Sequence, residues 1–208
     1  MKKGVFIAFE GLDGSGKTTQ FNAIINRLAA KKINCIAEKQ PSNCNPIGLL
    51  LRDIVKNAHD VSLSPLSLAK LFSIDRYEHV VNNIKPHIDA GRHVLIDRYV
   101  FSSFAYQGQA FTFDEIYSFN RDAIELLMPD LTIFIDTTPE ECTHRIASNR
   151  ASQELFDDNG IVIRNNFYNA FEKMKTSPTA IINGNQPTDA VTDEIWKAVE
   201  PLFEGGLS

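Results

Sequence analysis

The sequence predicts an α/β fold in which five parallel strands form one sheet with helices on both of its faces. Short apolar runs with β-branched residues recur along the chain, as expected of strands buried on both faces. Between them lie segments whose apolar residues recur at helical spacing. Such an alternation packs as three layers, helix, sheet and helix, with right-handed crossovers. The chain contains no internal repeat or linker, so we expect a single domain over residues 1–208.

The predicted strands are short apolar runs that end at loops or turns. The first covers residues 5–9 and leads directly into a glycine-rich loop, and the second covers residues 33–37. The third and fourth, residues 94–97 and 131–136, both end in an aspartate, and the last covers residues 179–182. Because parallel strands bring their carboxyl ends to one edge of the sheet, we expect the functional site at that edge.

Apolar periodicity and capping residues predict the helices. Ser64 and Pro65 suit the start of a long helix, as its cap and its first residue, and Gly91 suits its end. A helix also begins at Thr138, because glutamates fill the turn that follows. The predicted helices cover residues 17–30, 47–55, 65–90, 102–107, 113–127, 161–175 and 188–203, with one more beginning at Thr138.

Residues 11–19 read Gly-Leu-Asp-Gly-Ser-Gly-Lys-Thr-Thr and match the phosphate-binding pattern G-x-x-x-x-G-K-[ST] between a strand and a helix. Glycines let backbone N–H groups turn toward phosphate oxygens, and the helix N-terminus adds partial positive charge. Lys17 would reach the β- and γ-phosphates of a nucleoside triphosphate, and Thr18 would ligate Mg²⁺; the motif alone leaves open whether the protein is a kinase, a GTPase or an ATPase. The motif therefore predicts a P-loop NTPase fold. The predicted ATP-binding residues are Gly11, Leu12, Asp13, Gly14, Ser15, Gly16, Lys17, Thr18 and Thr19.

Two aspartates end predicted strands. Asp97 lies where the ligand binds in sheets of this kind, so it is a candidate for binding Mg²⁺ or its waters. Arg98, next to it, would lie close to bound phosphate; the alternative is that the two form a plain structural ion pair. Asp136 is followed by Thr-Thr-Pro, so we expect it to be a turn residue that bonds to the backbone.

Composition narrows the choice of partners and compartment. A net charge of −5 and a pI near 5.5 argue against binding to a nucleic-acid polymer. No window approaches the roughly 20 apolar residues that span a bilayer, so we expect no membrane partner. The three cysteines are odd in number and include no CxxC pair, which indicates a reducing compartment. We therefore expect a cytoplasmic protein.

The arginines indicate which phosphoryl transfer the loop serves. A phosphate monoester is already a nucleophilic dianion near pH 7, so its phosphorylation needs cations that bring two anions together and needs no general base. Each arginine taken alone is more simply a solvated charge. Together with the phosphate loop they favour a nucleoside monophosphate kinase. The candidates are Arg52, Arg76, Arg98, Arg145 and Arg150.

The chain resembles the thymidylate kinase family over nearly its whole length. The most specific part is Asp97-Arg98-Tyr99 and the residues that follow it to Ala-Tyr-Gln-Gly. The resemblance rests on residues 9–19, 46–48 with Arg52, 71–76, 97–108 and 129–131. It implies phosphate transfer from ATP to dTMP with Mg²⁺, in a homodimer. The alternatives are another nucleoside monophosphate or deoxynucleoside kinase, or a nucleotide-binding module that transfers nothing.

The resemblance also implies roles for individual residues. Phe72 would stack on thymine and Arg76 would donate to its 4-keto oxygen, whereas burial statistics alone make Phe72 a core residue. Tyr106 would crowd the 2′ position of the sugar. The implied dTMP-binding residues are Asp13, Arg52, Phe72, Arg76, Arg98, Ser103, Tyr106 and Gln107, and the implied catalytic residues are Lys17, Asp13, Arg98 and Arg150.

Residues 145–160 resemble the lid of this family, in which Arg150 is the best candidate to contact the transferred phosphate. Arg145 is the second candidate, and we interpret it as a solvated residue. Two positions depart from the family pattern. Gly14 stands where one branch of the family carries an arginine, and Gln40 stands where many members carry a glutamate.

Overall fold

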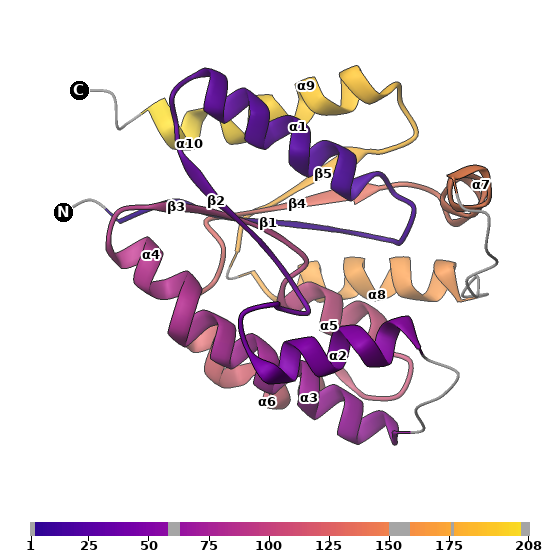
Figure 1. Cartoon of the computed structure of the whole chain (residues 1–208). Helices are drawn as coiled ribbons and strands as arrows, with labels where there is room; N and C mark the ends of the chain where they lie inside the picture. The colour runs from indigo at the N-terminus through magenta and orange to yellow at the C-terminus, as the bar shows by residue number, and fades with distance from the viewer. Residues whose placement is uncertain (1–2, 58–62, 150–158, 176, 205–208) are drawn as a thin grey trace.

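The sheet is the centre of the molecule (Figure 1). In the computed structural model, which describes residues 3–57, 63–149, 159–175 and 177–204, five parallel strands pair in the order β2-β3-β1-β4-β5. The strands are β1 (Phe6–Gly11), β2 (Cys35–Lys39), β3 (His93–Asp97), β4 (Leu131–Asp136) and β5 (Thr179–Asn183). The predicted α/β fold with a five-stranded parallel sheet is thereby confirmed.

Helices cover both faces of this sheet and form the two outer layers. Figure 1 shows α1, α9 and α10 over one face, α2 to α6 and α8 on the other side, and α7 beside the carboxyl ends of the central strands. No helix within the described ranges is both long and apolar enough to cross a membrane. The bounds are α1 (Lys17–Ala30), α2 (Pro46–Lys56), α3 (Pro65–His79), α4 (Lys85–Asp89), α5 (Val100–Gln107), α6 (Phe113–Leu126), α7 (Pro139–Asn149), α8 (Gly160–Lys173), α9 (Thr188–Val199) and α10 (Pro201–Glu204).

The two faces of β1 build two separate apolar cores. Phe6 and Ala8 pack with side chains of α4, α5, α6 and α8, whereas Ile7 and Phe9 pack with α1 and α9. Every residue of β1 is buried, which explains the apolar run from Phe6 to Phe9. The central strand is thus held rigidly between both helix layers.

The order of the strands decides where the site forms. β1 pairs with β3 on one side and with β4 on the other, and Phe9 is opposite Asp97 in the β1–β3 register. The loop after β1 therefore emerges beside the end of β3. This is the switch point at which ligands bind in open α/β sheets.

The long helix predicted over residues 65–90 is interrupted. After α3 the chain makes a π-helical segment, Val80–Ile84, in which the Lys85 N–H donates to the Val80 carbonyl, and only then enters α4. Pro86 supplies the physical reason, because its missing N–H cannot continue an α-helical ladder and the wider turn absorbs that loss. In the same way Pro201 separates α9 from α10 within the single helix expected over residues 188–203.

Candidate active site

The phosphate loop takes its shape from glycines. Gly14 and Gly16 have φ values of 80° and 94°, a conformation that side-chain-bearing residues rarely adopt. A Cβ at Gly14 would lie 2.5 Å from the Cys142 carbonyl oxygen, so this arrangement has no room for the arginine that one family branch carries there. Gly16 is the N-cap residue of α1 and has no side chain that could bond to the first turn. The first N–H groups of α1 therefore remain available to an anion.

Lys17 lies at the mouth of this loop. Its Nζ donates to the backbone oxygens of Gly11 (2.9 Å) and Leu12 (2.7 Å), and its side chain is buried. Burial, together with the nearby charge of Arg98, lowers the pKa of Lys17 to about 8. Within the described part of the chain the ammonium thus bonds to weakly basic carbonyl oxygens, which phosphate oxygens can replace.

Arg98 joins the phosphate loop to α5. Its Nη2 donates to Asp13 Oδ1 (2.7 Å) and to the Tyr106 hydroxyl (3.1 Å), and its Nη1 donates to Ser102 Oγ (3.0 Å). The charge of Arg98 lowers the pKa of Asp13 to about 2, so that carboxyl is ionised at neutral pH. Arg98 itself has a left-handed backbone, with φ of 71°. A turn of this kind at the end of β3 directs the guanidinium back across the sheet edge.

The donor set beside Lys17 fits a magnesium ion. Asp97 Oδ1 is buried and has no hydrogen-bond partner within the described part of the chain, while Oδ2 lies 3.3 Å from Lys39 Nζ. Thr18 and Asp97 line one and the same cavity. Mg²⁺ is commonly bound by one or two protein oxygens together with substrate phosphates and waters. Within the described ranges, no group of three or more His, Cys, Asp or Glu side chains could hold a metal ion.

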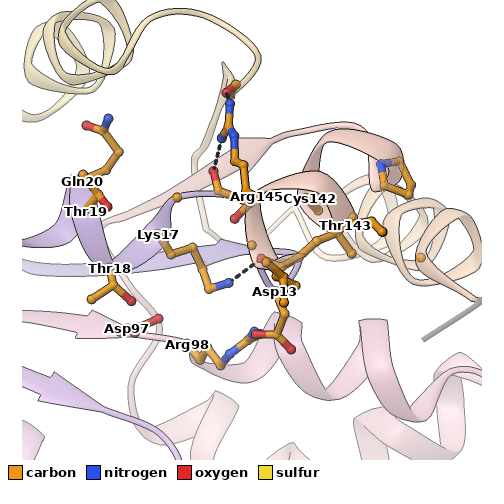
Figure 2. Close-up of a pocket in the computed structure, with 18 of the residues that line it drawn as sticks. Asp13, Lys17, Thr18, Thr19, Gln20, Asp97, Arg98, Cys142, Thr143 and Arg145 are labelled. Atoms are coloured by element: carbon orange, nitrogen blue, oxygen red, sulfur yellow. Dashed lines mark hydrogen bonds and ion pairs between the residues drawn. The ribbon is translucent and has the colours of Figure 1, made fainter. Parts of the chain in front are cut away.

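These side chains surround one cavity of about 680 Å³, a volume typical of small-molecule sites. In Figure 2 the Lys17 amine, Thr18 and Asp97 lie near the Arg98–Asp13 pair, with Arg145 across the loop. We call it the nucleotide cavity. Its walls come from the phosphate loop, the end of β3, α5, α7, the start of α8 and the loop after β5.

Arg145 corrects one interpretation of the sequence. It lies on α7, its Nη1 donates to the Ser15 carbonyl (3.3 Å) and its Nη2 donates to the Gly184 carbonyl (2.9 Å). Its Nε also pairs with Glu141 one turn earlier. The expectation of a solvated arginine was wrong, because α7 places this guanidinium between the phosphate loop and the loop after β5. Arg150, the other candidate, lies outside the described residues.

A second group of side chains surrounds Arg76, which is 2% exposed. Its Nε donates to Asn120 Oδ1 (3.0 Å), its Nη1 to Gln40 Oε1, and its Nη2 to Ser103 Oγ (2.6 Å). The guanidinium also lies over the ring of Tyr99. We call these residues the Arg76 cluster. It joins α3, α5, α6 and the end of β2, and no carboxylate in the described ranges forms an ion pair with Arg76.

The remaining predicted base-binding residues lie near this cluster in sequence. Phe72, one turn before Arg76 on α3, is half-buried and belongs to neither apolar core. Gln107, one turn after Ser103 on α5, has a buried Oε1 with no hydrogen-bond partner among the described residues. A bound base would stack on an aromatic ring that lies outside the core, and it would donate a hydrogen bond to the unpaired acceptor.

Asp75 fixes the loop that faces this cluster, a role that sequence patterns did not predict. Its carboxylate accepts from the Ser42 N–H (2.9 Å), the Ser42 hydroxyl and Asn45 Nδ2 (2.8 Å). Arg52, on α2, donates through Nε to the Ser42 carbonyl (3.1 Å). Asp75 and Arg76 therefore hold residues 40–45 from adjacent positions of α3. The only signal in the sequence was an acid directly before Arg76.

Asp136 corrects a second interpretation. Its two oxygens accept from Arg164 Nε (2.6 Å) and Nη2 (2.7 Å), and Oδ2 also accepts from the Tyr168 hydroxyl (2.8 Å). Burial would raise the pKa of Asp136, but these hydrogen bonds lower it below its usual range. The expectation that Asp136 is a backbone-bonding turn residue was therefore wrong. Asp136 forms an ion pair that joins α8 to the end of β4, because the guanidinium of Arg164 donates to both carboxylate oxygens.

Comparisons with known proteins agree with this geometry. The family model described as thymidylate kinase matches residues 9–195. A thymidylate kinase of Clostridium novyi is 36% identical over 205 residues, 94% of this chain and 98% of its own length. Thymidylate kinases of Leuconostoc mesenteroides and Bacillus licheniformis are 31% identical over 98% of this chain and 37% identical over 73% of it, spanning 99% and 72% of their own lengths. The chain belongs to the thymidylate kinase family.

Proposed function

We propose that this protein transfers the γ-phosphate of ATP to dTMP, giving ADP and dTDP, with Mg²⁺. One observation carries the proposal beyond membership of the family. Arg98 bonds to Asp13 of the phosphate loop and to Tyr106 of α5, and the same helix presents Ser103 to Arg76. A continuous set of contacts thus runs from the triphosphate loop to the Arg76 cluster, as a reaction between two bound nucleotides requires.

The cations of the nucleotide cavity suit a phosphate acceptor. Lys17 would hold the donor's phosphates, and Arg98 would hold the acceptor's phosphate and bring it into line. The acceptor is a dianion near pH 7, so the reaction needs no proton-abstracting residue. Thr18 and Asp97 would hold Mg²⁺, which when bound neutralises part of the phosphate charge. From its sequence position we assign Arg150 to the transferred phosphate.

The Arg76 cluster supports thymine as the base. A guanidinium has only N–H donors, so it favours the 4-keto oxygen of thymine over the 4-amino group of cytosine. Asn120, Gln40 and Ser103 fix the plane of the Arg76 guanidinium from three sides. The Phe72 ring, outside both cores, is available to stack on the base.

An acceptor panel tests the proposal. ADP release would be measured with ATP, Mg²⁺ and one of dTMP, dUMP, dCMP, AMP or thymidine. We expect dTMP to give the largest kcat/KM. A larger value with thymidine would identify a deoxynucleoside kinase, and a larger value with AMP or dCMP would identify another monophosphate kinase. ATP binding without turnover on any of them would identify a binding module.

The lowered pKa of Lys17 predicts a pH dependence. As pH rises through about 8, Lys17 loses its proton in the free enzyme and with it the charge that attracts the donor's phosphates. We therefore expect kcat/KM for ATP to fall above that pH, by up to about tenfold per pH unit. The Lys17→Arg variant keeps its charge at all these pH values, so its residual kcat/KM should stay flat. A wild-type profile that is level to about pH 9.5 would contradict the assignment.

We also propose that the protein is a homodimer. Four apolar side chains are exposed along α3 and the π-helical segment that follows it: Leu66, Ile74, Tyr77 and Val81 are 43%, 44%, 39% and 37% exposed. Their helical spacing places them within about a quarter-turn of one face. We call them the α3 stripe. Exposed apolar side chains that share one helix face are typical of subunit contacts. The reaction itself belongs to the cytoplasm in this proposal, since the three cysteines are free thiols.

A charge within the α3 stripe tests the dimer. Ile74→Glu should convert the protein to a monomer in sedimentation experiments, because an unpaired carboxylate would be buried at the subunit contact. Ile181→Glu is the matched control, since Ile181 is 49% exposed on the edge strand β5. A wild-type protein that sediments as a monomer at micromolar concentration would refute the proposed assembly.

A further inference from the structure

Glu10 is a buried carboxylate to which the proposed reaction gives no role. We infer that it is a positioning residue, which fixes the Arg98 guanidinium for the acceptor phosphate by acting through Ser102. The inference rests on the proposed function only in assigning the acceptor phosphate to Arg98. The contacts that carry it are independent of the identity of the base.

The first step is what Glu10 does for the backbone. It lies on the central strand β1 and is 0% exposed. Its Oε1 accepts from the N–H groups of Tyr99 (2.9 Å) and Ser102 (3.1 Å). No side chain of α5 caps that helix. A carboxylate from a neighbouring strand therefore caps the N-terminus of α5, where its negative charge is favourable.

The second step concerns the turn that carries Arg98. The Arg98 N–H donates to the Phe9 carbonyl (2.9 Å), and the next N–H, that of Tyr99, donates to Glu10. Consecutive residues of β1 thus hold the backbone on both sides of the left-handed Arg98. Left-handed backbone is unfavourable for a residue with a side chain and persists where surrounding bonds determine it.

The third step is a directed pair of hydrogen bonds. Ser102 Oγ donates to Glu10 Oε2 (2.6 Å) and accepts from Arg98 Nη1 (3.0 Å). A serine hydroxyl has one proton, so donating it to Glu10 leaves the oxygen's lone pairs for the guanidinium. With Nη1 held in this way, Nη2 faces Asp13 and Tyr106 at the nucleotide cavity. Glu10 does not line that cavity, so its influence passes through Ser102 and Arg98.

The Glu10→Gln variant tests the inference. The two backbone N–H groups keep the amide oxygen as their acceptor, so the amide nitrogen faces Ser102 and the serine proton loses its acceptor. We expect kcat/KM for dTMP to fall about tenfold or more, the effect of losing one charge-assisted hydrogen bond, while KM for ATP stays within about twofold. Asp130→Asn is the matched control, because Asp130 accepts from the Phe6 N–H at the opposite end of β1; it should leave the ratio of the two substrates' constants unchanged.

A double-mutant cycle separates positioning from plain stability. Ser102→Ala should also lower kcat/KM for dTMP, and the double variant with Glu10→Gln should be no worse than the poorer single variant. If the losses of kcat/KM for dTMP in the two single variants add up in the double variant, the inference is overturned. Losses of equal size for ATP and for dTMP would overturn it as well. If Glu10→Gln does not fold, Ser102→Ala decides alone: an unchanged kcat/KM for dTMP would refute the relay. Failure of the proposed function is distinct, since wild-type protein would then show no dTMP phosphorylation.

Discussion

Replacing Lys17 with alanine is expected to lower turnover at least about a hundredfold, on the scale of losing one charge-stabilising donor in a water-excluded site. The Lys17 ammonium lies at the mouth of the phosphate loop and bonds to two backbone carbonyls, those of Gly11 and Leu12. In the proposed reaction its loss would remove a cation that compensates the charge of the transferring phosphate. Steady-state rates with saturating ATP and dTMP measure the effect.

The fold should survive this change. Lys17 supplies a buried charge whose removal relieves a desolvation cost, so we expect little loss of stability. Lys31→Ala is the matched control, because it removes the same charge just after the C-terminal end of the same helix, where the side chain is exposed. A Lys17→Ala enzyme that turns over at a near-normal rate, with an unchanged circular dichroism spectrum, would refute the phosphate-binding role.

Replacing Arg76 with alanine is expected to lower kcat/KM for dTMP about a hundredfold while leaving ATP binding nearly unchanged. A base whose polar group accepts a hydrogen bond from the site binds much more weakly once the donor has been removed from that site. The variant should also unfold more easily, since Asn120, Gln40 and Ser103 each lose a buried partner at a cost of about 1–3 kcal/mol. Substrate kinetics, ATP titration and thermal melts measure the three effects separately.

Two further variants make the Arg76 result specific. Arg76→Lys keeps the charge, but a lysine ammonium cannot donate to three partners in one plane as the guanidinium does. We therefore expect this variant also to have a low kcat/KM for dTMP, while its melting temperature lies closer to that of the wild type. Arg121→Ala removes an exposed arginine from α6 and should change neither substrate's constants. Equal losses on ATP and dTMP in Arg76→Ala would contradict the base-binding role.

Sequence patterns predict what is local in this molecule. The glycine spacing of the phosphate loop specifies its own backbone, and apolar runs specify which strands are buried on both faces. The same reasoning predicts where β3 ends. It therefore places Asp97 and Arg98 at the edge of the sheet, where both line the nucleotide cavity. The interruption after α3 is also local, since Pro86 lies inside the predicted helix.

Contacts between distant segments could not be predicted in this way. Glu10 looks like an odd polar residue within an apolar strand, because its partners lie about ninety residues later in the chain. Asp75 pairs with a loop more than thirty residues before it, and Asp136 pairs with Arg164 of α8. Arg145 was misinterpreted for the same reason, since only the packing of α7 brings it to the phosphate loop.

Product analysis tests the central claim most directly: that one cavity holds two nucleotides and passes a phosphoryl group between them. The enzyme would be incubated with Mg²⁺, dTMP and ATP labelled in its γ-phosphate, and the nucleotides separated by chromatography. We expect label in dTDP, in equal amount to the ADP formed. Label in inorganic phosphate alone, or in no product while ATP remains bound, would contradict the claim.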